Sequence, residues 1–246
     1  MQAICHIDRI VPVAVESNQV PRNQEVGFRD ANRSQNSLLS GWERRCLLFL
    51  AARLPAWIKP DHLTVLGAAS LLGAGLSYWY SGSNRAGLFL ATLFLALNWL
   101  GDSLDGTLAR VRDKQRPRYG FYVDHVIDTF GTFFLLAGLG LSGYMHPWVA
   151  AGLLAAYLML SVEVYLATYT VGTFKLSHWK LSPTELRVLL VIGNAVLFYR
   201  PIVKLFGETL RLFDVGGVIG IAGIAAMLLT AVVRHAVYLY REERVS

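Results

Sequence analysis

Long apolar segments dominate the sequence and restrict what the chain can fold into. Each holds about 20 residues or more, the length that a helix needs to cross the hydrocarbon core of a membrane. The candidate spans are residues 60–81, 85–111, 120–142, 147–172, 184–206 and 214–240. The chain is also 54% hydrophobic, which is high for a soluble domain. The sequence therefore predicts an all-α fold, a polytopic membrane bundle of six transmembrane helices.

The residues before the first span have a different composition. Residues 1–39 are polar and show no periodicity, so we expect a disordered N-terminal segment. Residues 40–58 alternate apolar and charged side chains in helical fashion, which predicts an amphipathic juxtamembrane helix lying on the membrane surface. The alternative is that this stretch begins the first span, but Pro55 and Pro60 interrupt a continuous helix. Residues 59–246 then form the six-helix membrane domain.

The charge balance is basic, with 23 Lys and Arg against 17 Asp and Glu. We interpret this excess as the loop charge of a membrane protein, since no basic stretch alternates with aromatic residues that would stack on bases. We therefore expect membrane lipid as a partner and no nucleic acid. The two cysteines, Cys5 and Cys46, lack the spacing of a metal site or of a disulfide framework.

Basic residues also predict the orientation of the bundle. They cluster before the first span, after the second, after the fourth and in the C-terminal tail, which lie on one side if the number of spans is even. The opposite side has only Arg85 in its first loop. The positive-inside rule then places both termini, and the aspartates within residues 102–128, on the cytoplasmic side. The loop after the fifth span, with Arg200, Lys204 and Arg211, is an exception and makes spans five and six the weakest placement.

Four aspartates lie where the second span ends and the third begins. Asp102 and Asp105 are three residues apart, and Asp124 and Asp128 are four apart, so each pair shares one face of its helix. Two antiparallel helices can bring both pairs into one cluster. Four like charges beside lipid would repel strongly unless cations lay among them. An all-oxygen cluster suits a hard divalent cation such as Mg²⁺.

The residues between the two acidic pairs fit a ligand that carries phosphate. Gly106 and Ala109 are small and share the helical side of the first pair, so a ligand can approach the helix there. Arg110 begins a series of basic residues that can face phosphate oxygens. Gly120 opens the next helix, whose N-terminal end also favours anions.

The spacing of these residues resembles a family signature. The pattern reads Asp102-x2-Asp105-Gly106-x2-Ala109-Arg110-x9-Gly120-x3-Asp124-x3-Asp128. It is similar to the signature of the CDP-alcohol phosphatidyltransferase family, and all eight residue types match at the family's spacing. The apolar segments around it also suit that family.

The resemblance implies an integral-membrane enzyme of phospholipid synthesis. Members transfer a phosphate-linked group from a CDP-alcohol donor to an acceptor alcohol and release CMP. It implies a site with two divalent cations, Mg²⁺ or Mn²⁺, held by Asp102, Asp105 and Asp124. Asp128 is the expected general base for the acceptor hydroxyl and a possible further ligand.

The resemblance also assigns the residues that contact the donor. Gly106, Ala109, Arg110 and Gly120 are the expected contacts to its cytidine and diphosphate. Family members form homodimers, and we expect a homodimer here with each site inside one protomer.

The substrates stay open at this point. We favour CDP-diacylglycerol as the donor. The alternative is an aminoalcohol phosphotransferase that uses CDP-choline or CDP-ethanolamine with diacylglycerol, because Asp124-His125-x2-Asp128 is similar to the pattern of that group. Glu163, in the middle of the fourth span, either binds the acceptor or pairs with a basic residue for structure.

Two other classes of protein remain as alternatives. A transporter would also bury charges in a bundle, but it more often shows broken helices in paired halves. A membrane scaffold without activity would not need an intact set of four aspartates.

Overall fold

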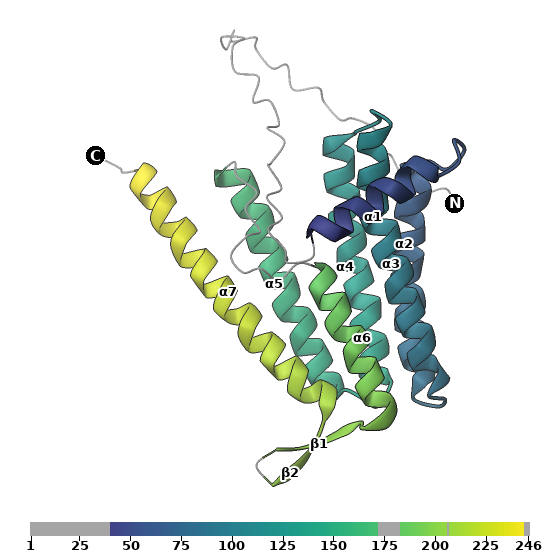
Figure 1. Cartoon of the computed structure of the whole chain (residues 1–246). Helices are drawn as coiled ribbons and strands as arrows, with labels where there is room; N and C mark the ends of the chain where they lie inside the picture. Colours follow the sequence, from purple (N-terminus) through teal and green to yellow (C-terminus); the bar gives the residue numbers. More distant parts are fainter. Residues whose placement is uncertain (1–39, 172–182, 206, 244–246) are drawn as a thin grey trace, which may run out of the picture.

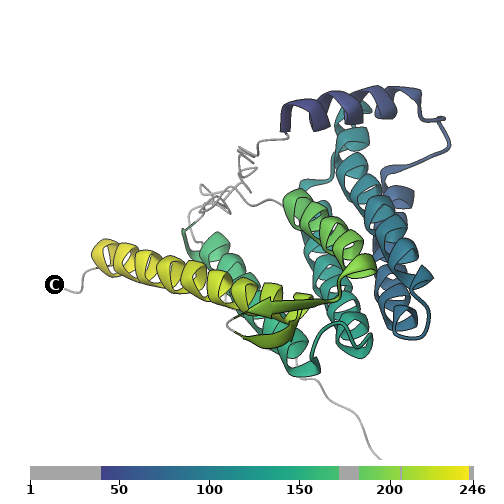
Figure 2. The ribbon, with the colours of Figure 1, turned by 60° about the horizontal axis from the view of Figure 1, so that its bottom comes forward.

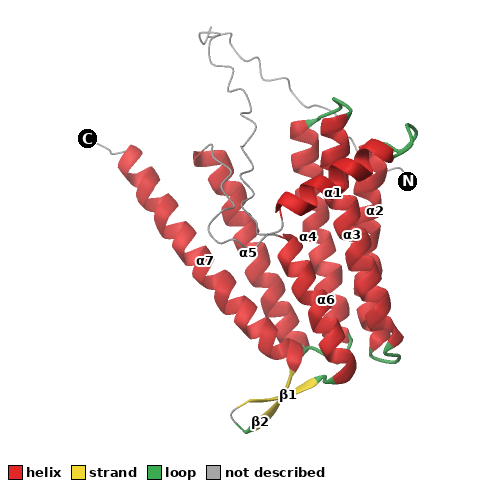
Figure 3. Cartoon of the chain, viewed as in Figure 1, coloured by secondary structure: helices red, strands yellow, loops and turns green. Residues whose placement is uncertain are grey.

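The computed structural model describes residues 40–171, 183–205 and 207–243, which are almost entirely helical (Figures 1 and 3). The elements are α1 (Ser40–Arg53), α2 (Pro60–Ser81), α3 (Ala86–Val111), α4 (Pro117–Leu141), α5 (Pro147–Val171), α6 (Pro183–Tyr199), β1 (Ile202–Leu205), β2 (Glu208–Arg211) and α7 (Leu212–Glu242). The predicted disorder of residues 1–39 lies outside the described residues.

Five of the described helices are long and apolar enough to cross a membrane: α2, α3, α4, α5 and α7. Their bounds lie close to the predicted spans, because prolines at positions 60, 117 and 147 each begin a helix. Proline is tolerated in the first helical turn, because a backbone N–H at that position has no hydrogen-bond partner within the helix. The chain is a multi-pass membrane protein.

The predicted fifth span, 184–206, is wrong at its C-terminal end. The helix α6 ends at Tyr199, and β1 and β2 then pair as an antiparallel hairpin with Ile202 opposite Arg211. Pro201 cannot continue the helix, and Gly207 turns the chain at a φ of 85°. The described part of the chain is therefore helical with one small hairpin, which lies at the end of the bundle away from α1 (Figure 1).

The helices α2, α3 and α4 form the tightest part of the bundle because glycines let their backbones touch. A Cβ at Gly101 would lie 2.7 Å from the backbone nitrogen of Gly67, and one at Gly138 would overlap the carbonyl oxygen of Gly75. Small residues allow such close approach between membrane helices. These contacts fix α3 and α4 against α2.

The helices α5 and α7 pack against each other on the other side of the bundle (Figure 2). Only 6% of the most apolar window of α5 and 11% of that of α7 are buried, against 44% for α2. Most of their apolar surface therefore faces outward, as expected of helices that meet lipid or another protein.

The first helix, α1, crosses the end of the bundle (Figure 1). Leu47 and Ala51 are buried against Leu63, Leu104 and Leu108 of α2 and α3. The predicted range of 40–58 is too long, since the helix ends at Arg53. Pro55 disfavours the helical conformation at Leu54, the residue before it, and so ends α1.

Candidate functional site

One pocket gathers the four aspartates predicted from the sequence. It lies between α2, α3 and α4, and its lining consists of Thr64, Gly67, Ala68, Asn98, Asp102, Asp105, Asp124, Ile127 and Asp128. Each aspartate is partly buried. The helical spacing of the two acidic pairs and the antiparallel course of α3 and α4 produce this arrangement, as the sequence indicated.

Asp102 forms an ion pair that the sequence did not predict. Arg187 of α6 donates from its guanidinium to Asp102 Oδ2 at 2.7 Å. The side chain of Arg187 is 14% exposed and that of Asp102 is 37% exposed. A charge-assisted hydrogen bond therefore joins α6 to α3 at the edge of the pocket.

The carboxylate of Asp105 accepts hydrogen bonds from two uncharged groups. The hydroxyl of Thr64 on α2 donates to Oδ2 at 2.7 Å, and the backbone N–H of Gly106 donates to Oδ1 at 2.5 Å. Both carboxylate oxygens therefore have a fixed direction. Thr64 is a second site residue that the sequence analysis missed, although it stands on the face of α2 that meets α3.

Asn98 lies one turn before Asp102 and links α3 to α2. Its Nδ2 donates to the carbonyl oxygen of Gly67 at 3.0 Å. Its Oδ1 is buried and has no hydrogen-bond partner among the described residues. A buried acceptor without a donor is costly in a protein interior. Asn98 lines the pocket, and its Oδ1 would gain from a cation or a hydrogen-bond donor there.

His125 follows Asp124 on α4, and its ring packs against two aromatic side chains. Its ring lies 4.2 Å from that of Phe121 and 5.1 Å from that of Tyr165, measured between centroids. Its Nδ1 is 2.6 Å from the carbonyl oxygen of Phe121. These contacts orient the helical turn that carries Asp124 and Asp128.

The residues that we expect to contact the CDP-alcohol donor lie outside the pocket of the aspartates. Gly106, Ala109, Arg110 and Gly120 do not line the pocket of the aspartates. A Cβ at Gly120 would meet nothing within 4 Å, and one at Gly106 would meet only the guanidinium of Arg110, at 3.6 Å. Arg110 is exposed, with its guanidinium donating to the Thr107 hydroxyl at 3.2 Å. Gly120 thus faces open space, and Gly106 faces only the end of a flexible side chain.

The oxygen atoms of the pocket are of the kind that bind a divalent cation, although the side chains that carry them do not converge on one point. Within the described ranges, no group of three or more His, Cys, Asp or Glu side chains stands close enough to hold an ion. Asp102 is turned toward Arg187, and Asp105 toward Thr64 and the Gly106 amide. Four carboxylates and an amide oxygen that lacks a donor nevertheless form a hard-oxygen set, the kind that Mg²⁺ prefers.

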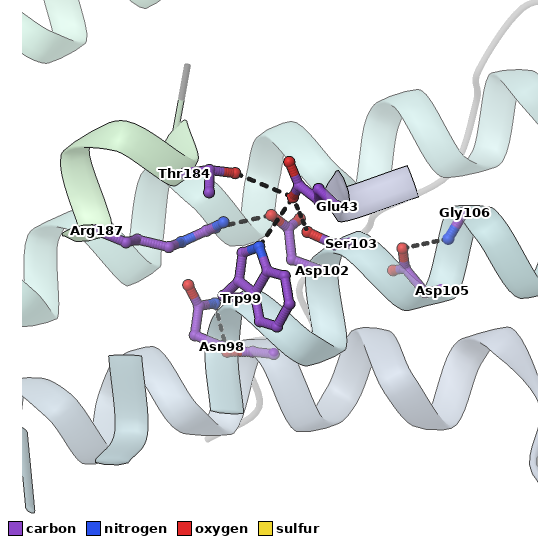
Figure 4. Close-up of polar contacts among 10 residues, drawn as sticks. Glu43, Asn98, Trp99, Asp102, Ser103, Asp105, Gly106, Thr184 and Arg187 are labelled. Carbon is purple, nitrogen blue, oxygen red and sulfur yellow. Dashed lines mark hydrogen bonds and ion pairs between the residues drawn. The ribbon is translucent and has the colours of Figure 1, made fainter. Parts of the chain in front are cut away.

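Glu43 of α1 forms a second polar cluster beside this pocket (Figure 4). Its Oε1 accepts hydrogen bonds from Trp99 Nε1 at 2.9 Å, from the Ser103 hydroxyl at 3.4 Å and from the Thr184 hydroxyl at 3.2 Å. The donors come from α3 and α6. In the sequence, Glu43 is one charged residue of the amphipathic pattern in residues 40–58, and its partners are too distant along the chain for that pattern to indicate them.

Glu163 lies outside the pocket, on the packed seam of α5 and α7. Its Oε1 is 2.6 Å from Nδ1 of His235, and its side chain is 11% exposed. Of the two alternatives considered for Glu163, the structure supplies a basic partner on the neighbouring helix.

Comparison with known proteins gives matches over most of the chain. Residues 57–235 match the family described as CDP-alcohol phosphatidyltransferase. Cholinephosphotransferase 1 of Danio rerio is 24% identical over 85% of this chain and 57% of its own length. Phosphatidylinositol phosphate synthase of Cutibacterium acnes is 29% identical over 42% of this chain and 47% of its own length.

A solved structure has a similar fold. Phosphatidylinositol phosphate synthase of Mycobacterium tuberculosis, crystallised with CDP-DAG bound, is 18% identical, with a TM-score of 0.54. The match covers 80% of this chain and 94% of that one. By contrast, the chain spans little more than half the length of the Danio rerio relative.

Proposed function

The chain belongs to the CDP-alcohol phosphatidyltransferase family, and from this premise we propose that it transfers a phosphate-linked group from CDP-diacylglycerol to an acceptor alcohol and releases CMP. The observation that carries the proposal is the pocket lined by Asp102, Asp105, Asp124 and Asp128. Two helices contribute two carboxylates each, at the family's spacing.

The proposed site holds divalent cations through Asp102, Asp105 and Asp124. Bound Mg²⁺ or Mn²⁺, two ions in this proposal, would neutralise the diphosphate of the donor and the phosphate that leaves. The unpartnered oxygen of Asn98 supports a cation close to Asp102. Thr64 would keep Asp105 directed by its hydrogen bond.

Asp128 is the proposed general base. Its carboxylate accepts the proton of the acceptor hydroxyl, whose oxygen attacks the phosphorus that bears the transferred alcohol. A new P–O bond forms, the bridging P–O–P bond breaks, and the bridging oxygen leaves with CMP. The position of Asp128 on α4, one turn after Asp124, suits this division of roles.

Gly106, Ala109, Arg110 and Gly120 are the proposed contacts to cytidine and diphosphate. The open space at Gly120, and the flexible Arg110 side chain as the one neighbour that a Cβ at Gly106 would meet, support close approach of a ligand to α4 and α3. The exposed guanidinium of Arg110 can turn toward a phosphate group and bind it through two N–H donors.

The second candidate is an aminoalcohol phosphotransferase that uses CDP-choline or CDP-ethanolamine with diacylglycerol. The relatives that favour it are cholinephosphotransferases from Danio rerio and Gallus gallus, each matched over 85% of this chain. We prefer the lipid donor because the similar solved structure, which has CDP-DAG bound, is matched over 94% of its own length.

The proposed topology has six spans, with α6 as the fifth, and places both termini and the aspartates on the cytoplasmic side. A helix of 17 residues is at the lower limit for crossing a membrane. We also propose a homodimer whose sites each lie within one protomer, since all four aspartates line one pocket of one chain.

The decisive experiment is a donor assay with the purified full-length protein. Labelled CDP-diacylglycerol and CDP-choline are incubated separately with a panel of small alcohols and diacylglycerol, and CMP release is measured with Mg²⁺, with Mn²⁺ and with EDTA. We expect metal-dependent CMP release from CDP-diacylglycerol. Release from CDP-choline alone would favour the second candidate, and unchanged release in EDTA would contradict the metal site.

A further inference from the structure

Oε1 of Glu43, on α1, accepts hydrogen bonds from two other helices. Trp99 and Ser103 donate from α3, and Thr184 donates from α6 (Figure 4). Because one atom accepts all three bonds, it fixes the first turn of α6 relative to the end of α3. An interhelical contact of this kind sets a register between helices.

The donors flank the ion pair at the edge of the pocket. Trp99 lies one turn before Asp102, and Ser103 follows it directly. Thr184 lies one turn before Arg187 on α6. The turns that Glu43 holds are therefore the turns that carry Asp102 and Arg187, whose side chains meet at 2.7 Å.

Attachment of α1 to the bundle does not by itself require Glu43. Leu47 and Ala51 are buried, at 6% and 2% exposure, in an apolar cluster with α2 and α3. Glu43 adds polar bonds beside the pocket, including a bond to α6, which the apolar cluster of α1 does not contact. Its bonds thus reach a helix that the packing of α1 leaves out.

Arg187 places a positive charge where a divalent cation would approach Asp102. The guanidinium bonds to Oδ2 of Asp102, and its positive charge repels a metal ion that approaches the same carboxylate, so the two compete for its negative charge. The pair is only partly buried, and its contribution is therefore modest compared with that of a buried ion pair. A modest competitor can shift the affinity of the cation without abolishing binding.

We propose that Glu43 is a positioning residue that, through Thr184, holds Arg187 on Asp102 and thereby lowers the affinity of the aspartate pocket for its divalent cation. The surface helix α1 then takes part in setting the metal affinity of the site. This inference rests on the proposed metal site, and its test separates the two.

The test measures Mn²⁺ binding by the full-length protein in nanodiscs, with free Mn²⁺ followed by electron paramagnetic resonance. Arg187→Met removes the competing charge and should tighten binding about fivefold. Glu43→Ala should tighten binding about twofold to threefold, because Arg187 loses its tether. Glu43→Gln keeps an acceptor oxygen and should bind as the wild type does.

Epistasis shows whether Glu43 acts through Arg187. In the double variant, Glu43→Ala should add nothing to the effect of Arg187→Met. Thr184→Val removes the hydroxyl donor with little change in volume, and it should reproduce the effect of Glu43→Ala. This variant also carries the test if Glu43→Ala does not fold.

The control is Leu47→Ala, which loosens the packing of α1 but leaves the hydrogen bonds of Glu43 in place. It should lower thermal stability without tightening Mn²⁺ binding. Equal tightening by Leu47→Ala, weaker binding in Glu43→Ala, or an effect of Glu43→Ala that persists beside Arg187→Met would each overturn the inference. No Mn²⁺ binding by the wild type, or binding unaffected by Asp102→Asn, would overturn the metal site and this inference together.

Discussion

Two regions of the bundle are held together by different kinds of contact. In α2, α3 and α4, an added Cβ at Gly75, Gly101 or Gly138 would meet the backbone of a neighbouring helix. In α5 and α7, an added Cβ at Gly152 or Gly220 would meet only the end of an apolar side chain, at 3.2 Å. Backbone contacts cannot adjust, whereas side-chain ends can. The aspartates thus stand on the rigid region and the packed seam of α5 and α7 on the adaptable one.

The largest expected effect comes from filling a backbone contact. Gly138→Ala should cost about 3 kcal/mol or prevent folding, because its Cβ would overlap the carbonyl oxygen of Gly75. The matched control is Gly223→Ala on α7, where a Cβ would meet nothing within 4 Å. Thermal unfolding in detergent compares the two. Equal stability of both variants would remove the distinction between the regions.

The next largest effect concerns the catalytic roles proposed for the aspartates, which stand on the rigid region. Asp128→Asn should lower kcat about 10³-fold while metal and donor still bind, because only the proposed base is lost. Asp102→Asn and Asp124→Asn should instead abolish metal and donor binding. Donor dissociation constants and single-turnover CMP release separate the two classes. Near-normal turnover of Asp128→Asn at saturating substrates would refute the assignment of the base.

A smaller effect tests the donor contacts at the end of α3. Arg110→Lys keeps the charge but loses the planar pair of donors, so donor binding should weaken about tenfold. The control is Arg53→Lys on α1, whose guanidinium lies over the Phe49 ring and away from the pocket. An unchanged donor dissociation constant in Arg110→Lys would exclude a two-point phosphate contact.

The smallest effect concerns the seam of α5 and α7. A double-mutant cycle with Glu163→Ala and His235→Ala should give a coupling of about 1 kcal/mol in the free energy of unfolding, as is usual for polar contacts between membrane helices. The cycle is measured by thermal or denaturant unfolding. Additive losses would mean that the 2.6 Å contact contributes no stability. A coupling larger than the loss in Gly138→Ala would reverse the order of the two regions.

The sequence alone predicted the parts of the site that depend on local spacing. The spacing of Asp102, Asp105, Asp124 and Asp128 along two helices was enough to expect one cluster, and the four line one pocket. The predicted starts at residues 60 and 147 match those of α2 and α5, whereas α4 begins at Pro117, three residues before the predicted start at Gly120, because proline suits the first helical turn. In each case the signal lay within a few helical turns.

Long-range contacts were missed for a physical reason. Arg187 and Glu43 reach α3 from helices that are distant along the chain, and no periodicity reports which faces of those helices meet it. Arg187 is the one basic residue of α6, and that could have marked it as a candidate. The end of α6 was misplaced because the apolar residues after Pro201 form a hairpin instead of a further helical turn.

The unequal lengths of α6 and α7 have a consequence for the surrounding bilayer. A helix of 17 residues rises about 25 Å, less than the roughly 30 Å thickness of a hydrocarbon core. In the six-span arrangement proposed above, thinning of the membrane beside α6 would match the length of this helix, whereas α7, with 31 residues, is long enough to cross at a tilt. Figure 1 shows α7 leaning away from the other helices. Thinning beside α6 would bring the headgroup layer nearer to Arg187 and Asp102, so that a water-soluble nucleotide head and its lipid tails could reach the pocket together.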